Sequence, residues 1–184
     1  PSDADLLHTA AQYLPGRSAW MWSLPLELNF IVERGEGSRL HDTRGRAYVD
    51  YVMGSGPLLL GHAHPAVVRA VQAQVAKGST YFWLSEPTVR LAELICKAVP
   101  CGEKIRFVST GTEATMFAIR MARVFTRREK VLKFEGGWHG LHDYGMIGNW
   151  RTGEAPYPTP VPDIGGIPKG AMESVLIAPF NDLA

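Results

Sequence analysis

The stretch that most constrains the fold is the run IRFVSTGTEATMFAIRM at residues 105–121. Its first four residues, Ile-Arg-Phe-Val, are β-branched or aromatic apart from the arginine, which predicts a short buried strand. A small polar turn, Ser-Thr-Gly-Thr, follows. Thr110 and Glu113 then have the spacing of a capping box, which predicts that a helix starts here. Apolar residues continue at helical spacing through this helix: Ala114, Phe117, Ala118 and Met121.

A strand, a small turn and a helix N-terminus together make a geometry that binds phosphate. The first amides of a helix have no internal partner, and the helix dipole favours an anion beside them. Gly111 allows a close approach of the backbone, and the hydroxyls of Thr110 and Thr112 add donors. The alternative is an ordinary, well-capped connection, because the run matches neither a Walker loop nor a dinucleotide-binding fingerprint. These residues alone leave both interpretations open.

Composition narrows the class of protein. The sequence has 184 residues, of which 46% are apolar and 20% charged, and this is enough for one domain with a real core. The net charge of +1 marks neither a nucleic-acid partner nor a membrane surface. Cys96 and Cys101 form neither a metal pattern nor a disulfide framework, which favours a cytoplasmic location. Asn181 and Asp182 resemble the first residues of a helix that does not follow in the sequence, so we expect a fragment of a longer protein.

Further elements alternate along the chain. Strands separated by a helix predict an α/β domain whose site lies at the carboxyl ends of parallel strands. Residues 141–170, rich in proline and glycine, predict a long segment without regular structure, typical of lids or disorder. The other expected elements are helices at 6–14, 65–78 and 87–99, a hairpin of 39–42 with 47–50, and strands at 130–134 and 174–178.

Three groups of side chains are candidates for ligand contact. Trp138 and His139 lie between glycines just past a predicted strand, where they are placed for a ligand rather than for the core. His62 and His64 have a spacing that can bind metal, but no third ligand lies nearby, so we expect no metal site. The aromatic patch of Trp20 and its neighbours predicts either core or interface packing, or a substrate-pocket wall.

Several motifs together resemble the class III pyridoxal-phosphate (PLP) aminotransferases of fold type I. The likeness runs from about residue 13 to the end, and is nearest to the glutamate-1-semialdehyde aminomutase branch and the amine and β-amino-acid transaminases beside it. The motifs are Arg-Gly-Glu-Gly at 34–37, Gly-His-Ala-His-Pro at 61–65, residues 105–134, Phe-Thr-Arg-Arg at 125–128, and FEGGWHG at 134–140. The resemblance implies a parallel-rich sheet flanked by helices. Residues 1–60 would belong to a small domain, and 61–184 to the first part of the large PLP-binding domain.

The resemblance also implies roles for residues of this chain. Thr110, Gly111 and Thr112 match the family's phosphate cradle. Trp138 matches the aromatic residue that stacks on the pyridine ring of PLP, and His139 has a supporting role rather than proton transfer. Residues 81–83 match a dimer interface beside the neighbouring active site, so a homodimer is expected, and residues 141–170 match a segment that gates the site.

The family's catalytic lysine and the Asp that pairs with the pyridine nitrogen both lie downstream of residue 184. The chain is therefore expected to hold no catalytic residue of its own. None of its lysines has the context of the PLP-bound lysine, and most read as helix-surface or strand-end residues: Lys77, Lys97, Lys104, Lys130, Lys133 and Lys169.

Two departures from the family bear on the substrate. Trp20 stands where the aminomutase and β-amino-acid branches carry a carboxylate-binding Arg, with Arg17 three residues away, and Ser55 stands where the aminomutase has a Trp. With Trp22, these residues favour a hydrophobic or aromatic substrate group. The expected activity is transfer of an amino group from an amine or (β-)amino acid to a keto or aldehyde acceptor. Glutamate-1-semialdehyde 2,1-aminomutase is the second candidate, and a non-catalytic PLP- or phosphate-binding relative and a PLP racemase stay open.

Overall fold

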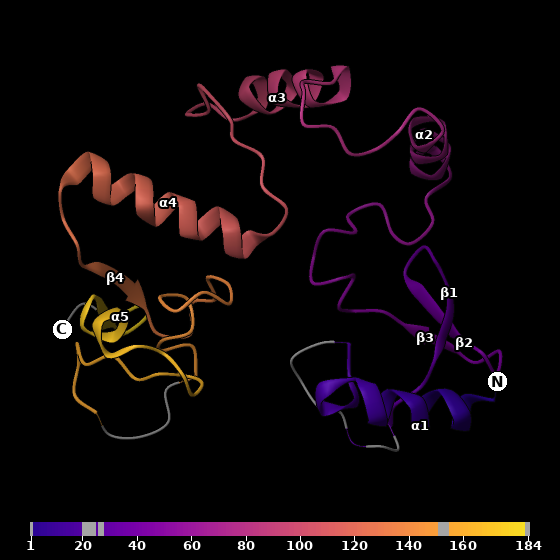
Figure 1. Cartoon of the computed structure of the whole chain (residues 1–184), viewed down its shortest axis with the longest axis horizontal. Helices are drawn as coiled ribbons and strands as arrows, with labels where there is room; N and C mark the ends of the chain where they lie inside the picture. Colours follow the sequence, from indigo (N-terminus) through magenta and orange to yellow (C-terminus); the bar gives the residue numbers. More distant parts are fainter. Residues whose placement is uncertain (1, 20–24, 26–27, 151–154, 183–184) are drawn as a thin grey trace. The chain divides into compact units, whose positions relative to one another are not determined.

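The computed structural model describes residues 2–19, 25, 28–150 and 155–182. It separates into two compact units, Pro1–Ser85 and Glu86–Ala184 (Figure 1). The expected division into domains at residue 60 stays a prediction. Within the described residues, no helix is both long enough and apolar enough to cross a membrane.

The first unit is built around a small antiparallel sheet. Helix α1 (Asp3–Tyr13) precedes the single turn η1 (Pro15–Arg17). Strands β1 (Val32–Glu36), β2 (Arg39–Asp42) and β3 (Ala47–Val49) then pair in the order β1-β2-β3. The predicted hairpin is confirmed as β2 and β3, and β1 adds a third strand. Helix α2 (Pro65–Val75) starts at its proline as predicted.

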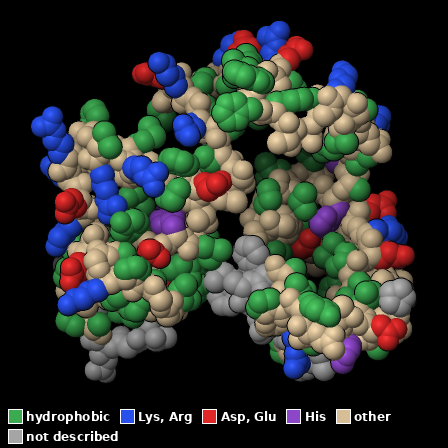
Figure 2. Space-filling view, in the orientation of Figure 1, with side chains coloured by type: hydrophobic (Ala, Val, Ile, Leu, Met, Phe, Trp, Pro, Cys, Tyr) green, Lys and Arg blue, Asp and Glu red, His purple; other side chains and the backbone are tan. Residues whose placement is uncertain are grey.

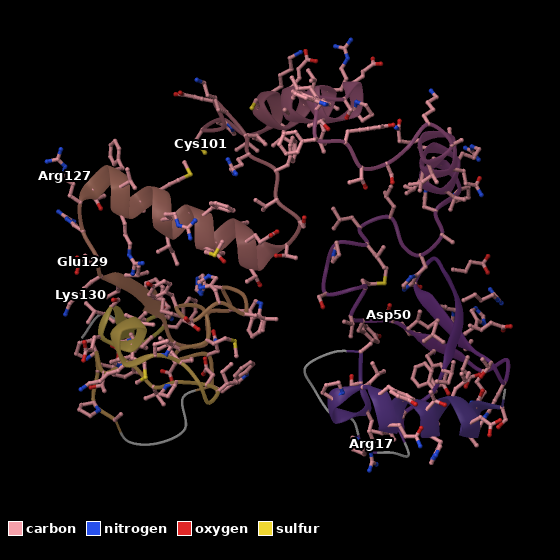
Figure 3. The ribbon with its side chains drawn as sticks, in the orientation of Figure 1. Arg17, Asp50, Cys101, Arg127, Glu129 and Lys130 are labelled. Carbon is pink, nitrogen blue, oxygen red and sulfur yellow. The ribbon has the colours of Figure 1, made fainter. Side chains whose placement is uncertain are left out.

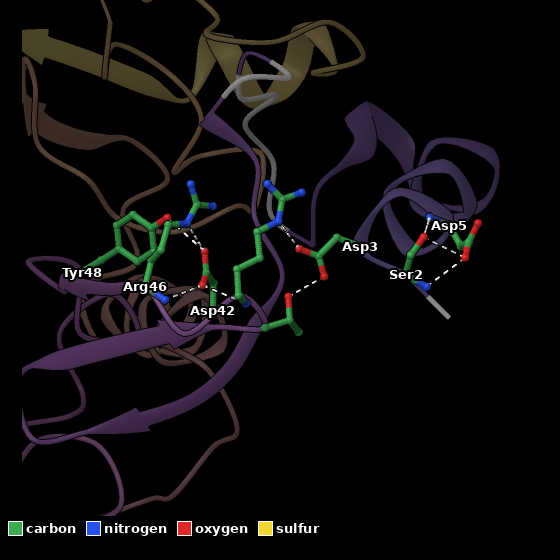
Figure 4. A network of polar contacts seen from close by, with 8 residues as sticks. Ser2, Asp3, Asp5, Asp42, Arg46 and Tyr48 are labelled. Atoms are coloured by element: carbon green, nitrogen blue, oxygen red, sulfur yellow. Dashed lines mark hydrogen bonds and ion pairs between the residues drawn. The ribbon is translucent and has the colours of Figure 1, made fainter.

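A buried carboxylate holds the hairpin turn together. Asp42 is 0% exposed. It accepts hydrogen bonds from the backbone amides of Arg44 and Arg46, from Arg46 Nε at 2.7 Å and from the hydroxyl of Tyr48 at 3.1 Å (Figure 4). Desolvation opposes ionisation of Asp42, but these hydrogen bonds hold its pKa below the ordinary value. Asp3 of α1 pairs with Arg44 Nε at 2.8 Å, so the same turn also anchors the first helix.

The second unit contains helices α3 (Glu86–Ala98), α4 (Gly111–Thr126) and α5 (Lys169–Glu173), and strands β4 (Val131–Phe134) and β5 (Val175–Ala178). The two strands pair in parallel, from Val131 opposite Val175 to Phe134 opposite Ala178. The α/β class is therefore confirmed. A left-handed Arg127, with φ of 57°, ends α4 and turns the chain through Glu129 and Lys130 toward β4 (Figure 3).

The strand predicted at residues 105–108 is wrong for this structure. Those residues lie outside the strands, and the parallel sheet of the described residues contains β4 and β5 alone. An apolar β-branched run supplies only the propensity of a strand. Its backbone becomes a strand when another segment hydrogen-bonds to it, and no described segment does so here.

The segment at 141–170 is more ordered than predicted. Met146 and Ile147 are both 0% exposed, and Ile147 forms the core of the unit with Val175 and Ile177. Ile147 also forms an isolated antiparallel bridge with Pro162. The described residues 141–150 and 155–168 form no helix or strand, as predicted, but the buried Met146 and Ile147 show that this part is packed and not disordered. This packing comes from long-range contacts, which helical or strand periodicity does not predict. The role of the segment as a gate stays a prediction.

The larger helices leave their apolar faces open. None of the described residues of α1, α2, α3 or α4 is buried, and apolar side chains are widespread on the face seen in Figure 2. Leu91 and Leu94 of α3 have the spacing of a face that could be buried, yet they are 47% and 64% exposed. An amphipathic pattern predicts which face of a helix can be buried, but burial also needs another element to pack on that face.

Candidate active site

The N-terminus of α4 has two free amides. Thr110 is the N-cap, and its Oγ1 accepts from Glu113 N at 3.1 Å, as the capping box predicts. Glu113 Oε2 in return accepts from the amides of Ser109 and Thr110, at 2.7 and 3.1 Å. Among the described residues, no group accepts a hydrogen bond from the amides of Gly111 and Thr112. These two amides can therefore donate hydrogen bonds to a ligand at the helix end, where the helix dipole also favours an anion.

The space beside these amides is open. A Cβ added to Gly111 would meet no heavy atom within 4 Å. Thr110 Oγ1 and Thr112 Oγ1 both accept from backbone amides, the latter from Leu141 N at 3.0 Å. A hydroxyl that accepts in this way still has its own hydrogen to donate. The residues present thus fit a phosphate group, with two amides and two hydroxyls as donors.

A glycine-rich turn after β4 packs directly on this helix end. Gly140 has φ of 96° and is so close to Thr112 that an added Cβ would lie 2.7 Å from both Thr112 Cα and Oγ1. Only glycine combines this conformation with such a close approach. Thr115, one turn further along α4, donates to the backbone oxygen of His139 at 2.6 Å. The structure therefore joins the predicted cradle and the predicted Trp138-His139 turn, which are more than 20 positions apart in the sequence.

The side chains of this turn have different surroundings. The ring of Trp138 lies 5.7 Å from that of Trp150, centroid to centroid, and 47% of the residue is exposed. His139 Nδ1 is 2.7 Å from the oxygen of Gly137, so the imidazole folds back on its own turn. An open pocket of about 450 Å³ lies at the carboxyl ends of β4 and β5, and Trp138 is not among its lining residues: Phe134, Glu135, Gly136, Gly137, His139 and Phe180.

A buried lysine lies beneath the turn. Lys133 is only 6% exposed, and its Nζ donates to Gly145 O at 2.9 Å and to Asn149 Oδ1 at 3.1 Å. Asn149 in turn donates to Asp163 Oδ2 at 2.7 Å. Burial lowers the pKa of Lys133, and the charge of Asp163 partly opposes this shift. Lys133 lies near the end of its strand, as predicted, and the alternation of β4 turns its side chain inward, which sequence reasoning did not anticipate.

The remaining candidate residues belong to the first unit. Ser55 has φ of 69°, in a turn in which its amide donates to Val52 O. Asp50 accepts from the amides of Val52 and Met53, and its Oδ2 lies 2.7 Å from His62 Nε2, so this pair ties the two ends of the glycine-rich loop together (Figure 3). Trp20 and Trp22 lie outside the described residues. Among those described, no group of three His, Cys, Asp or Glu side chains could hold a metal ion.

Sequence reasoning missed Thr115 and His142. His142 Nε2 lies 3.0 Å from Thr115 Oγ1, and His142 Nδ1 accepts from Gly145 N at 3.1 Å. Arg123 places its guanidinium 4.3 Å from the centre of the Tyr144 ring. The sequence does contain a signal for these contacts. The spacing of Thr112, Thr115 and Arg123 places the three side chains on one face of α4.

The helix end, the glycine-rich turn and the parallel strands have the fold of the fold type I PLP-dependent transferases, and known structures support this fold class. An omega-transaminase from Sphaerobacter thermophilus superimposes with a TM-score of 0.89 at 34% identity, covering 98% of this chain and 42% of that one. A transaminase with PLP bound gives a TM-score of 0.88 at 31% identity, over 97% of this chain and 41% of that one.

Sequence comparison identifies the family. The family model described as aminotransferase class-III matches residues 24–165, and the chain belongs to this family. The glutamate-1-semialdehyde 2,1-aminomutase of Methanopyrus kandleri is 44% identical over 183 residues, which cover 100% of this chain and 42% of the relative. The chain thus spans about two fifths of the length of this curated relative.

Proposed function

We propose that the complete protein containing this chain is a PLP-dependent aminotransferase. It would move an amino group from an amine or (β-)amino acid with a hydrophobic or aromatic group to a keto or aldehyde acceptor. The observation that carries the proposal is the open N-terminus of α4, fastened to the glycine-rich turn after β4 in a chain of the class III family.

The phosphate of PLP would rest on the start of α4. Its second pKa is about 6, so it is close to a dianion at neutral pH. The amides of Gly111 and Thr112 and the hydroxyls of Thr110 and Thr112 would donate to it. Glu113 accepts from the amides of Ser109 and Thr110, so among the described residues the amides of Gly111 and Thr112 are the ones left at this helix end for the anion.

The turn after β4 would orient the ring of the cofactor. Trp138 is proposed to stack on the pyridine, and its exposed indole leaves a face available for that contact. His139 is assigned a supporting role, and its Nδ1 lies 2.7 Å from Gly137 O, a contact that holds the imidazole against its own turn. Bound PLP supplies an electron sink for breaking a bond at the carbon that carries the amino group.

The catalytic lysine and the Asp partner of the pyridine nitrogen are proposed to lie downstream of residue 184. Lys133 is the buried lysine of the described residues, but its hydrogen bonds to Gly145 and Asn149 give it a structural role. A homodimer with active sites near its interface and a cytoplasmic location also belong to this proposal.

The substrate class is argued from three positions. Trp20 replaces a bidentate Arg that would bind a carboxylate, Trp22 adds apolar surface, and Ser55 replaces a bulky Trp and so leaves room. Glutamate-1-semialdehyde 2,1-aminomutase is the second candidate. The 44% identity over the whole chain to a relative of that name favours it. The third and fourth candidates are a non-catalytic PLP-binding relative and a PLP racemase.

A substrate panel with the complete protein tests the choice. Aromatic amines, aliphatic amines and β-amino acids are each mixed with a keto-acid acceptor, and glutamate-1-semialdehyde is supplied without an acceptor. We expect acceptor-dependent amine transfer. Isomerisation of glutamate-1-semialdehyde as the single activity would establish the aminomutase. Cofactor binding without turnover would favour the non-catalytic relative, and inversion of an amino acid without transfer would favour the racemase.

A further inference from the structure

His142 joins the turn after β4 to α4 through a continuous chain of hydrogen bonds. Gly145 N donates to the backbone oxygen of His142 at 2.8 Å and also to His142 Nδ1 at 3.1 Å, so this ring nitrogen acts as an acceptor and carries no hydrogen. The hydrogen of a neutral imidazole must then be on Nε2, which lies 3.0 Å from Thr115 Oγ1. The backbone amide of Gly145 thereby selects one tautomer of His142.

Thr115 passes this chain on to the turn. Its Oγ1 receives the hydrogen of His142 Nε2 and donates its own single hydrogen. The oxygens of Gly111, Thr112 and His139 are all within reach, at 3.0, 3.1 and 2.6 Å, and His139 O is the nearest. The direction is therefore Gly145 N–H to His142, His142 to Thr115, and Thr115 to His139 O. Every donor and acceptor is satisfied while His142 is neutral.

The charges around His142 favour that neutral state. His142 is half-buried, and burial is the largest cause of its lowered pKa. Asp143 opposes the shift, whereas Lys133 of β4 and His139 of the turn reinforce it. The Tyr144 ring lies 6.1 Å from the imidazole, centroid to centroid. The guanidinium of Arg123 of α4 lies over the Tyr144 ring.

We propose that His142 is a positioning residue of the cofactor site, which in its neutral Nε2–H form fastens the turn bearing Trp138 and His139 to α4 through Thr115. The presence of the cofactor in this inference rests on the proposed function, whereas the hydrogen bonds of His142 do not depend on it. Protonation would put a hydrogen on Nδ1, facing the N–H of Gly145. The Nδ1 acceptor would be lost and two donors would face each other, while Gly145 N would keep the backbone oxygen of His142. The repulsion would displace the imidazole and weaken its contact with Thr115, through which the turn is held to the helix that forms the phosphate cradle.

The first test is the tautomer itself. Nitrogen-15 spectra of the histidine side chains in the complete protein, assigned by His142→Asn, distinguish a protonated from an unprotonated ring nitrogen. We expect His142 at pH 7.5 to show an unprotonated Nδ1 and a protonated Nε2, with a pKa below that of an exposed histidine. The opposite tautomer, or a charged ring at this pH, would overturn the proposal. This measurement needs no bound cofactor, so it stands even if the proposed function fails.

The second test is the pH profile of PLP binding, followed by cofactor absorbance from pH 5.5 to 8. PLP phosphate titrates near pH 6 by itself, so the comparison is between wild type and His142→Asn. The Asn side chain can keep the acceptor for Gly145 N but cannot titrate. We expect wild-type affinity to fall several-fold more than that of the variant as the pH drops. Parallel profiles would overturn the proposal, whereas absence of PLP binding at every pH would reject the proposed function alone.

Thr115 supplies a matched pair of variants in case His142→Asn fails to fold. Thr115→Val removes the hydroxyl at nearly constant volume, and Thr115→Ser keeps it. We expect Val to weaken PLP binding several-fold and to flatten the pH profile, with Ser close to wild type. Equal behaviour of the two variants would contradict a role for the hydroxyl in the chain of hydrogen bonds.

Discussion

The hydroxyl of Thr115 lies 2.6 Å from the backbone oxygen of His139, and through this contact the first turns of α4 hold the glycine-rich turn after β4. A helix end alone offers donors to any anion. Fastened to the turn that bears Trp138, it forms the site that we propose for the cofactor. Both the cradle and the packing that supports it can therefore be tested by substitution.

Thr112→Val in the complete protein should weaken PLP binding about tenfold or more, because a hydrogen bond to a charged group contributes roughly 1.5–3 kcal/mol. The variant also removes the acceptor of Leu141 N. Thr112→Ser keeps the hydroxyl and serves as the control. Absorbance of retained cofactor after dialysis measures the effect, and full retention by the Val variant would argue against the phosphate cradle.

Gly140→Ala should destabilise the protein by about 1–3 kcal/mol, because overpacking of this size has that typical effect. The added Cβ would lie 2.7 Å from Thr112 Cα in a residue whose φ is 96°. Gly166→Ala is a matched control, since Gly166 has φ of 88° but no heavy atom within 4 Å of an added Cβ. Denaturant unfolding of both variants separates steric clash from backbone strain. Equal losses would mean that the close approach to Thr112 is unimportant.

Lys133→Met should lower the stability by about 1–3 kcal/mol, because Gly145 O and Asn149 Oδ1 would lose a buried donor. Lys130→Met, at an exposed position just before β4, is the control and should change stability little. Unfolding midpoints in denaturant provide the comparison. A Lys133 variant as stable as its control would show that relief of the lysine's desolvation offsets the lost hydrogen bonds.

Asp42→Asn should remove a pH-dependent part of the stability. Against the effect of desolvation, hydrogen bonds hold the pKa of Asp42 below its unfolded value of about 3.9, so the folded state gives up this proton more readily than the unfolded state. Its contribution is complete above that value and is lost as the pH falls through the folded-state pKa. Thermal unfolding at several pH values should show a deficit at pH 7 that narrows toward pH 3. Glu33→Gln, at an exposed position on β1, is the control for the loss of a carboxylate.

Local patterns in the sequence predicted much of the fold. The capping box of Thr110 and Glu113, the hairpin at the Asp42 turn and the proline that starts α2 all depend on residues only a few positions apart. Each of these features depends on contacts between the backbone and nearby side chains, so the spacing of residues in the sequence is enough to predict it. Motifs spread over the chain likewise indicate the class III family.

The tertiary structure decided what depends on distant neighbours. The burial of Lys133, the packing of Ile147 and the hydrogen bond between His142 and Thr115 join segments that sequence spacing cannot bring together. The strand expected at 105–108 does not form, and the apolar face of α3 stays exposed, because no described segment pairs with the one or covers the other. Propensity and periodicity describe what a segment can do, whereas pairing and burial require a second segment that only the fold can supply.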